Sequence, residues 1–367
     1  MLKKFSVENF KGFQGKFTLD LSRPGNYAFS KECIKNGVVS KAAIYGINGI
    51  GKSNLGLAIF DIVTQLTDKL REIDKYANYI NLDGHKPYVY FEYEFQFDND
   101  ILVYKYSKMN VNTLVEESLS INGKEMLYYD YRAKKGSSSF AGSEVLNLQS
   151  DSANSRVKYV MGTAVLTDNN KENIVLNKFK DFVDKMLLFY SLRKNGFIGF
   201  KQNGDLLEKA IIEANKLKDF EDFINSQGLH VNLASIDSPE GKKIYFSHKN
   251  GLIHYFRECS TGMESLILLY FWLIQLEQCS FVYIDEFDAF YHYELAEMII
   301  KKLKEFKDTQ IIVTTHNTDL LNNDLMRPDC YYVLTEEKID SLNHLTEKDL
   351  RLAHNLQKLF KTGAFNE

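Results

Sequence analysis

The sequence predicts an α/β fold with a mostly parallel core sheet, an antiparallel β lobe and a helical subdomain. Short apolar runs at 42–45, 281–284 and 310–313 are separated by helical segments, which is typical of buried parallel strands. Aromatic and polar residues alternate over 88–106, and this period of two predicts strands. Apolar residues recur three and four positions apart over 171–227, so helices are expected there.

The first elements of the chain are a predicted strand pair. Residues 5–13 and 15–21 alternate apolar and polar positions, with a Lys-Gly turn between the runs. The apolar strand 42–45 then leads into a glycine-rich loop and a helix that we expect to reach Lys75. The Asp-Asn-Asp segment 98–100 predicts the turn of a hairpin.

The antiparallel sheet is expected to continue over 118–131, around a second turn at Asn122-Gly123-Lys124. The segment 134–155 is rich in Ser, Gly and Asn, which predicts an exposed, mobile loop. Later strands are expected at 231–233 and 243–248, and later helices at 262–277 and 294–306.

Composition limits the classes of function. The chain has 367 residues and a formal net charge of −4, which argues against a protein that coats nucleic acid non-specifically. Its four cysteines are scattered without a C-x-x-C pair, so we expect small buried side chains in a reducing compartment. No apolar run is long enough to span a bilayer, and no secretory signal opens the chain. These features predict a cytoplasmic protein without a membrane partner.

The glycine-rich loop is a phosphate-binding motif. Residues 46–53 read Gly-Ile-Asn-Gly-Ile-Gly-Lys-Ser, a Walker A pattern between a predicted strand and a predicted helix. Its backbone N–H groups are expected to surround phosphates, with Lys52 on the β- and γ-phosphates and the Ser53 hydroxyl on Mg²⁺. The chain is therefore expected to bind a nucleoside triphosphate. The binding candidates are Gly46, Asn48, Gly49, Gly51, Lys52, Ser53 and Asn54.

Two acids end the apolar strand 281–284. Parallel strands present ligands at their carboxyl ends, where open α/β sheets bind nucleotides. We expect Asp285 to hold Mg²⁺ and Glu286 to act as the general base on the attacking water. The next apolar strand ends in Thr-Thr-His, which would bring His316 to the same edge of the sheet.

A third segment, Ser260-Thr261-Gly262, opens the predicted helix 262–277. Ser260 is a good N-cap, and the N–H groups of Thr261 and Gly262 suit a γ-phosphate. Plain helix capping explains the same residues, so this segment alone does not decide between the two interpretations.

Taken in order, these motifs resemble ABC-type ATPases of the SMC/RecF/OLD group. The opening Val-Glu-Asn-Phe-Lys-Gly-Phe, 7–13, is similar to the N-terminal strand of that group. The tail, with Arg-Pro-Asp-Cys-Tyr at 327–331, His-Asn-Leu-Gln-Lys-Leu at 354–359 and Gly-Ala-Phe at 363–365, resembles stand-alone AAA-type ATPases of bacterial abortive-infection and anti-phage systems. The resemblance covers both ends of the chain well and the middle poorly.

The resemblance implies an ABC-type P-loop NTPase that uses ATP and Mg²⁺, with Lys52, Glu286 and His316 as catalytic residues. It also implies that Ser260 and Gly262 contact ATP held by a second subunit, in a head-to-tail dimer or higher oligomer. The segment 287–292 would be the D-loop, with His292 where many relatives carry Asp. By this resemblance, Ser260 and Gly262 belong to the signature motif of the group. The segment departs from the usual Ser-Gly-Gly-Gln/Glu at Thr261 and Met263, and Glu264 is shifted by one position. Gln96 is not assigned as the Q-loop glutamine.

We expect three parts: an N-terminal ATPase lobe over 1–165, a helical insertion over 166–230 and a C-terminal ATPase lobe over 231–367. About 200 residues without heptads separate the glycine loop from Ser260, so no long coiled-coil arm is expected. About 50 residues follow His316, too few for the Toprim nuclease domain of OLD proteins.

Three functional hypotheses follow. The leading one is the sensor or motor ATPase of an anti-phage defence complex, with a separately encoded effector such as a nuclease. A RecF-like ATP-dependent DNA clamp is the second. Basic residues on the predicted helices are interleaved with acids, so a solvated helix face explains them better than a DNA groove. The third is an assembly factor in which ATP locks an oligomer.

Overall fold

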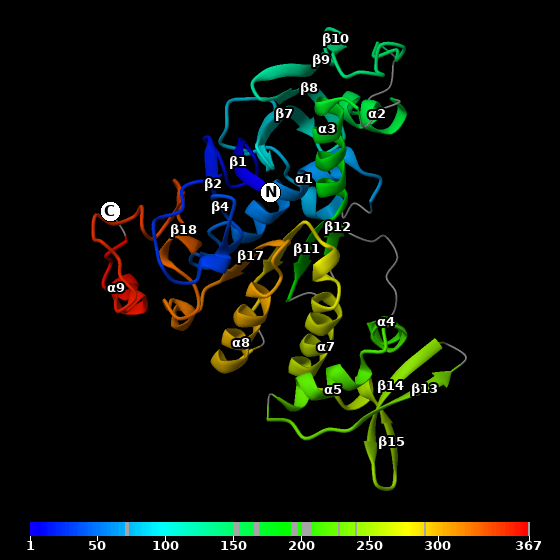
Figure 1. The fold of residues 1–367 in the computed structure, drawn as a ribbon, viewed down its shortest axis with the longest axis vertical. Coiled ribbons are helices and arrows are strands. Elements are labelled where there is room, and N and C mark those ends of the chain that lie inside the picture. The colour runs from blue at the N-terminus through cyan, green and yellow to red at the C-terminus, as the bar shows by residue number, and fades with distance from the viewer. Residues whose placement is uncertain are drawn as a thin grey trace.

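The computed structural model contains two large sheets and a smaller lobe (Figure 1). The antiparallel sheet lies at one end of the long axis, the smaller lobe lies at the other, and the core sheet lies between them. The structure describes residues 1–69, 73–149, 154–164, 169–191, 197–199, 207–226, 228–238, 241–289 and 291–365.

The core sheet has seven strands in the order β12-β11-β16-β17-β5-β18-β19. Its five central strands are parallel and the two edge strands are antiparallel to their neighbours. Every residue of the central strands is buried, which explains why they appear in the sequence as continuous apolar runs. The strands are β5 (Lys41–Tyr45), β11 (Met186–Tyr190), β12 (Phe197–Gly199), β16 (Phe281–Asp285), β17 (Gln310–Thr315), β18 (Tyr331–Leu334) and β19 (Ile339–Ser341).

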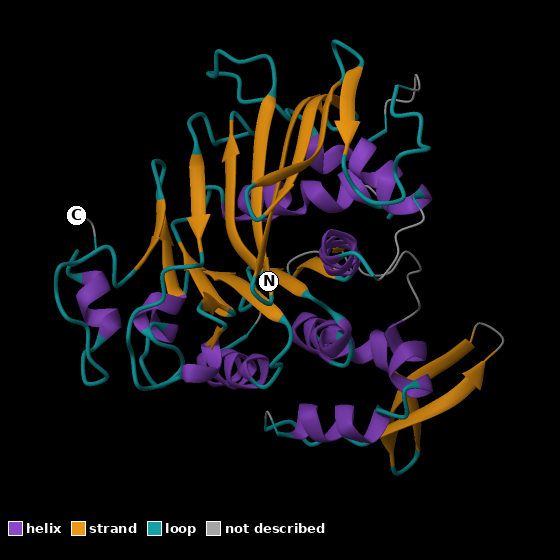
Figure 2. Cartoon of the chain, turned by 45° about the horizontal axis from the view of Figure 1, so that its top comes forward, coloured by secondary structure: helices purple, strands orange, loops and turns teal. Residues whose placement is uncertain are grey.

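The second large sheet is antiparallel, in the order β10-β9-β8-β7-β6-β1-β2, and Figure 2 shows its long strands side by side. Strand β6 alternates buried and half-buried residues, as its period of two predicts. The predicted N-terminal strand pair and both predicted turns are confirmed. The strands are β1 (Leu2–Glu8), β2 (Phe17–Asp20), β6 (Val89–Phe97), β7 (Asp100–Asn110), β8 (Thr113–Ile121), β9 (Lys124–Asp130) and β10 (Lys135–Ser138); β3 (Ile34–Lys35) and β4 (Val38–Val39) form a separate hairpin.

Helix α1 (Lys52–Leu66) lies between the two large sheets. A Cβ on Gly56 would come within 2.7 Å of the Tyr283 ring, so a glycine lets the helix approach β16 closely. On the other side, the Tyr93 hydroxyl of β6 donates to the Ala58 carbonyl at 2.9 Å. Thirteen of the helix's fifteen residues are buried, because an all-round apolar helix needs cover on every side. This double packing holds the start of α1 in place.

Two expectations for the first lobe are wrong. Helix α1 ends at Leu66 and does not reach Lys75, which lies in a separate 3-10 turn over Ile73–Tyr76. Thr67 ends the helix: its backbone is extended, and its hydroxyl donates to the Val63 carbonyl at 2.6 Å. The segment 134–155 is not simply an exposed loop, because it contains β10 and its Phe140 is buried. Residues 150–153 of that segment lie outside the described residues.

The expected helical region 171–227 contains helices α3 (Lys171–Asp184), α4 (Leu207–Glu213) and α5 (Leu217–Asn225), and departs from the prediction directly after α3. Met186 and Leu187 do not continue that helix but begin β11, which pairs in parallel with β16 in the core sheet. The run Met-Leu-Leu-Phe-Tyr is apolar at every position, and a short run of this kind fits a buried strand as well as a helix. Residues 192–196, 200–206 and 227 of this range lie outside the described residues.

The smaller lobe is the sheet β13-β14-β15 covered by helices, with Phe220, Phe246 and Tyr255 among its buried residues. The predicted strand 243–248 is confirmed within β14, whereas most of 231–233 precedes β13. The helix expected over 262–277 ends at Leu273. The elements are β13 (Leu233–Ser238), β14 (Gly241–His248), β15 (Gly251–His254), α4 (Leu207–Glu213), α5 (Leu217–Asn225), α6 (Tyr255–Glu258) and α7 (Thr261–Leu273).

The remaining helices are α2 (Arg156–Thr163), α8 (Tyr293–Lys304) and α9 (Leu356–Lys361). Helix α8 matches the predicted helix 294–306 within two residues at its end. In the part of the chain that the structure describes, no helix has both the length and the apolar character needed to cross a bilayer.

Candidate functional site

The glycine-rich loop connects β5 to α1, in the predicted order of strand, loop and helix. Gly49 has φ 84° and Gly51 has φ 113°, a left-handed region that glycine adopts without steric cost. Gly51 is the N-cap of α1, so the first N–H groups of the helix face the loop. Asn48 is exposed in the loop, and Asn54 is half-buried in the first turn.

Lys52 reaches back into this loop. Its ammonium donates to the carbonyls of Gly46 at 2.8 Å and Ile47 at 3.2 Å. Burial lowers the pKa of Lys52, and the negative charges of Glu286 and Asp285 act in the opposite direction. The lysine therefore lies in the electrostatic field of the acidic pair, 233 residues further along the chain.

Ser53 and Asp285 are in direct contact. The Ser53 hydroxyl donates to Asp285 Oδ2 at 2.5 Å, and the Thr314 hydroxyl donates to Asp285 Oδ1 at 2.8 Å. Asp285 is 5% exposed. In addition, the Tyr283 hydroxyl of β16 donates to the Lys52 carbonyl at 2.7 Å. The glycine loop and the acidic pair, predicted separately from the sequence, thus meet at one edge of the core sheet.

Glu286 has a left-handed backbone, with φ 50°. This region is sparsely populated by residues other than glycine and persists where neighbouring groups hold it. Two hydrogen bonds to Thr314 do so: Glu286 N–H donates to the hydroxyl at 2.8 Å, and Phe287 N–H donates to the carbonyl at 3.1 Å. The chain therefore turns sharply directly after β16.

His316 follows β17, which lies between β16 and β5 in the sheet. The side chain is exposed, at the same sheet edge as Asp285 and the glycine loop. Beside it, the Thr315 hydroxyl donates to Asp288 Oδ2 at 2.8 Å. Burial raises the pKa of Asp288, while this hydrogen bond and the charge of His316 lower it.

Ser260 and Gly262, the candidates for the signature motif, are at the start of α7. Ser260 is exposed and caps α7, accepting a hydrogen bond from Met263 N–H at 3.3 Å. Gly262 is in the first turn of the same helix. Among the described residues, neither forms a hydrogen bond with the glycine loop or the acidic pair. In the expected D-loop, His292 caps α8, and residue 290 lies outside the described residues.

Gln96, which the sequence left unassigned, is the residue before the last of β6. Its amide donates to the carbonyls of Asn36 and Asp98 at 3.4 and 3.2 Å. These contacts involve none of the motif residues, so the position of a Q-loop glutamine stays open.

The donor set fits a nucleotide with Mg²⁺. Hydroxyl and carboxylate oxygens are the ligands that Mg²⁺ prefers, and Ser53 and Asp285 bring one of each together. No atom outside the neighbouring residues lies within 4 Å of a Cβ built on Gly49, so the loop is open at that point.

Sequence analysis did not assign a role to Thr314, Thr315 or Tyr283. The Thr-Thr-His motif could have drawn attention to the two threonines. It does not predict that Thr314 binds Asp285 and that Thr315 binds Asp288.

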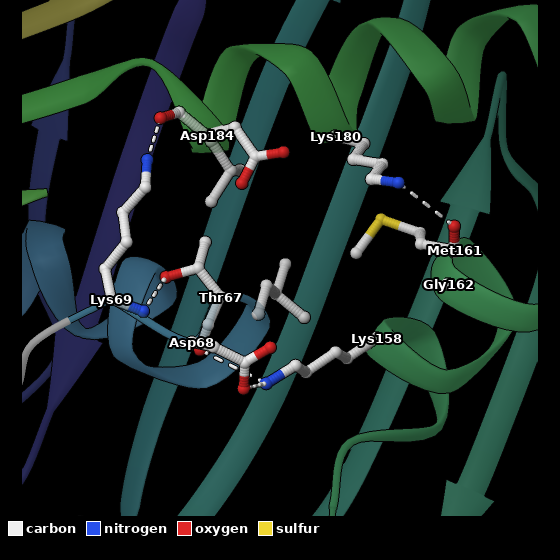
Figure 3. A pocket seen from close by; sticks show the side chains of 10 residues that line it. Thr67, Asp68, Lys69, Lys158, Met161, Gly162, Lys180 and Asp184 are labelled. Atoms are coloured by element: carbon white, nitrogen blue, oxygen red, sulfur yellow. Dashed lines mark hydrogen bonds and ion pairs between the residues drawn. The ribbon is translucent and has the colours of Figure 1, made fainter. Parts of the chain in front are cut away.

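A cavity of about 460 Å³ lies at the other end of α1, away from the glycine loop (Figure 3). Helices α1, α2 and α3 end beside it, and three lysines donate to their last carbonyls. Cations at helix C-termini satisfy carbonyls that lack a partner within the helix. The lysines therefore act as helix caps, and none of the motif residues lines this cavity. The pairs are Lys69 with Asp184, Lys158 with Thr67 and Lys180 with Met161.

Comparison with solved structures finds similarity to SMC head domains. An SMC head bound to the C-winged-helix domain of ScpA is 16% identical, with 93% of this chain and 97% of that chain covered and a TM-score of 0.49. The SMC head domain from Thermotoga maritima is 15% identical, with 93% and 99% covered and a TM-score of 0.46. An Smc head with an extended coiled coil, bound to the C-terminal domain of ScpA from Pyrococcus furiosus, is 14% identical, with 93% and 96% covered and a TM-score of 0.47.

The family of the chain is identified by its sequence. No curated protein matches it. Residues 41–322, more than half of the chain, match the family model described as "AAA domain, putative AbiEii toxin, Type IV TA system". This range runs from the first residue of β5, through the glycine loop and the acidic pair, to beyond His316. The chain belongs to this AAA-domain family of nucleotide-binding ATPases.

Proposed function

We propose that the protein is a Mg²⁺-dependent ATPase whose reaction takes place where the glycine loop meets the acidic pair. The observation that carries the proposal is the 2.5 Å hydrogen bond from Ser53 to Asp285. These residues come from two motifs 232 residues apart in the chain, and both have the chemistry of Mg²⁺ ligands. Family membership supports ATP as the nucleotide.

Each residue has a defined task in this proposal. The N–H groups of the loop from Gly46 to Gly51, together with Lys52, bind the phosphates. Ser53 and Asp285 would hold Mg²⁺, which would supply positive charge to offset the charge that develops on the phosphate oxygens. Glu286 accepts a proton from the attacking water, and His316 polarises or orients the groups at the γ-phosphate. The left-handed turn at Glu286 gives its carboxylate a position distinct from that of Asp285.

We further propose a dimer that closes around two ATP molecules. The exposure of Ser260 at the start of α7, and its lack of contact with the glycine loop of its own chain, support a contact with ATP on a second copy. ATP binding would then favour the closed dimer by its preference for that state, and hydrolysis would reopen it.

The biological role proposed is that of a sensor or motor ATPase in an anti-phage defence complex with a separate effector such as a nuclease. The family description, with its toxin and toxin–antitoxin terms, supports this role. Co-purification of the tagged chain from infected and uninfected cells tests it. We expect a nuclease or toxin partner, whereas ATPase activity that rises steeply with duplex DNA at low salt would instead favour a DNA clamp.

The catalytic assignment is tested by Glu286→Gln in the full chain. Because the substitution removes the base and keeps the shape, we expect loss of phosphate release with retained ATP binding, measured by calorimetry. Lys52→Ala is the matched comparison and should weaken ATP binding itself. Wild-type turnover in Glu286→Gln would disprove the role of the base.

A further inference from the structure

We infer that Thr314 is a positioning residue of this site, whose hydroxyl holds the Asp285 carboxylate and the Glu286 backbone in fixed relation. The inference rests on the proposed function, because it concerns how the two acids are aligned for a metal-bound nucleotide. Thr314 itself is completely buried at the carboxyl end of β17, so it acts through its neighbours and does not touch the substrate.

The hydroxyl uses both of its hydrogen-bonding capacities on the acidic pair. The hydroxyl donates a hydrogen bond to Asp285 Oδ1 at 2.8 Å, and its oxygen accepts a hydrogen bond from the Glu286 N–H at 2.8 Å. A hydroxyl has one proton to donate, so Asp285 fixes its rotation. Because the group is buried, water cannot replace either partner.

The Asp285 carboxylate is held at both oxygens. Thr314 binds Oδ1 and Ser53 binds Oδ2, from two different elements. A metal ion bound by the Ser53 hydroxyl and the carboxylate would change the surroundings of Oδ2, whereas Thr314 would still hold Oδ1 from inside the sheet. Thr314 therefore sets the orientation in which Asp285 meets the metal.

The same residue holds the turn at Glu286. The left-handed backbone at φ 50° is disfavoured for a residue with a Cβ and needs support from its surroundings. Thr314 supplies it through the hydroxyl, and also through its carbonyl, which accepts the Phe287 N–H at 3.1 Å. Loss of the hydroxyl would leave the Glu286 N–H without this partner and free the general base to move.

The chain offers a matched control at the other end of β17. Thr309, immediately before the strand, is also buried, and its hydroxyl has the carbonyls of Leu276 and Cys279 as alternative or shared acceptors at 2.7 and 3.0 Å. Thr309→Val removes a buried hydroxyl from a comparable setting without contact with the acidic pair. It reports what the loss of such a group does to the fold alone.

The test compares Thr314→Val, Thr314→Ser and Thr309→Val in the full chain. For Thr314→Val we expect kcat to fall about 10- to 100-fold, with KM for ATP changed by less than about threefold. The Mn²⁺ concentration that half-saturates the nucleotide complex, read by electron paramagnetic resonance, should rise about tenfold. Thr314→Ser keeps the hydroxyl and should restore both values to near wild type.

Thermal unfolding of all variants verifies that they are folded under assay conditions. The inference is overturned if folded Thr314→Val shows wild-type kcat and Mn²⁺ affinity, or if Thr309→Val loses as much of both. The Mn²⁺ measurement does not depend on turnover. An inactive wild-type chain would therefore contradict the proposed ATPase function while the role of Thr314 toward the metal is still decided.

Discussion

Two buried carboxylates, one within α1 and one beside its start, are held in different ways. Asp61, in the middle of the helix, is fully buried and receives Lys108 Nζ at 2.9 Å together with the Tyr79 and Tyr106 hydroxyls at 2.7 and 2.8 Å. Asp285, beside the start of the helix, accepts side-chain hydrogen bonds from the Ser53 and Thr314 hydroxyls, and among the described residues from no other side chain. Among the described residues, no Lys, Arg or His nitrogen lies within 4.0 Å of its carboxylate.

The difference between the two sites indicates that Asp61 has a structural role, whereas Asp285 has the surroundings of the proposed catalytic site. The charge of Asp61 is neutralised by a lysine that is itself 1% exposed, so this cluster joins α1 to the antiparallel sheet and has no capacity left for a ligand. The Asp285 carboxylate is oriented by hydroxyls without a cation in direct contact, which suits the proposed binding of a divalent cation. Substitutions of Lys108 and Asp285 test this contrast directly, and substitutions of Lys41 and Thr67 test a buried cation and a helix cap for comparison.

Lys108→Met should have the largest effect on the fold. It leaves the Asp61 carboxylate buried without its cation, which costs about 3–5 kcal/mol of unfolding free energy. Urea denaturation measures this loss. The double variant Asp61→Asn/Lys108→Met should recover part of it, because the buried charge is gone. A single variant within about 1 kcal/mol of wild type would show that the pair is not the anchor of α1.

Asp285→Asn should affect turnover instead of the fold. Removing the charge that we propose as a Mg²⁺ ligand is expected to lower kcat about 10²- to 10³-fold, with the unfolding free energy within about 1 kcal/mol of wild type. Phosphate release at saturating Mg²⁺ measures it. Asp61→Asn makes the same chemical change elsewhere beside α1 and should destabilise the protein while the folded fraction keeps its kcat. If both variants behave alike, the contrast fails.

Lys41→Met tests a buried charge of the opposite sign at the start of β5. Burial lowers the pKa of Lys41 to about 8 from its ordinary 10.5, and its ammonium donates to the Thr309 carbonyl at 2.7 Å. The folded chain therefore binds fewer protons than the unfolded chain between these pH values, and stability rises with pH across that window. At pH 7 we expect Lys41→Met to be more stable by about 2 kcal/mol, after allowing for the lost hydrogen bond.

The gain from Lys41→Met should vanish as the pH approaches 10.5, measured by urea denaturation across the range. A gain that does not depend on pH would mean that the buried charge is not its cause. ATP affinity should stay unchanged, because the residue is at the opposite end of β5 from Gly46.

Thr67→Ala should have the smallest effect. Thr67 ends α1 through the bond from its hydroxyl to Val63, and its oxygen accepts the Lys69 N–H at 3.3 Å. Loss of these bonds should cost about 1 kcal/mol without a change in KM for ATP. Val63→Ala, a nearby apolar truncation, gives the scale for a packing loss. An altered KM in Thr67→Ala would show that the cavity end of α1 communicates with the glycine loop.

Prediction from sequence succeeded where the signal is local. The glycine loop, the strand ending in Asp285-Glu286 and the alternating strand β6 each occupy a short stretch, and all three lie where the pattern indicated. It failed at Met186–Leu187, because a uniformly apolar run has no period to separate strand from helix. It also failed at the end of α1, where one threonine cap outweighed the expected continuation to Lys75.

The sequence alone was sufficient to predict a nucleotide-binding site and the residues that form it. Both motifs are recognised from short stretches of sequence. One is a run of glycines followed by Lys52-Ser53, and the other is a pair of acids at the end of an apolar strand. Tertiary structure alone decided which distant groups meet: β17 inserts between β5 and β16, so Thr314 reaches Asp285 across 29 positions, and Ser53 reaches it across 232. The physical reason is that hydrogen bonds act over about 3 Å, and only the order of strands in the sheet brings such residues within that range.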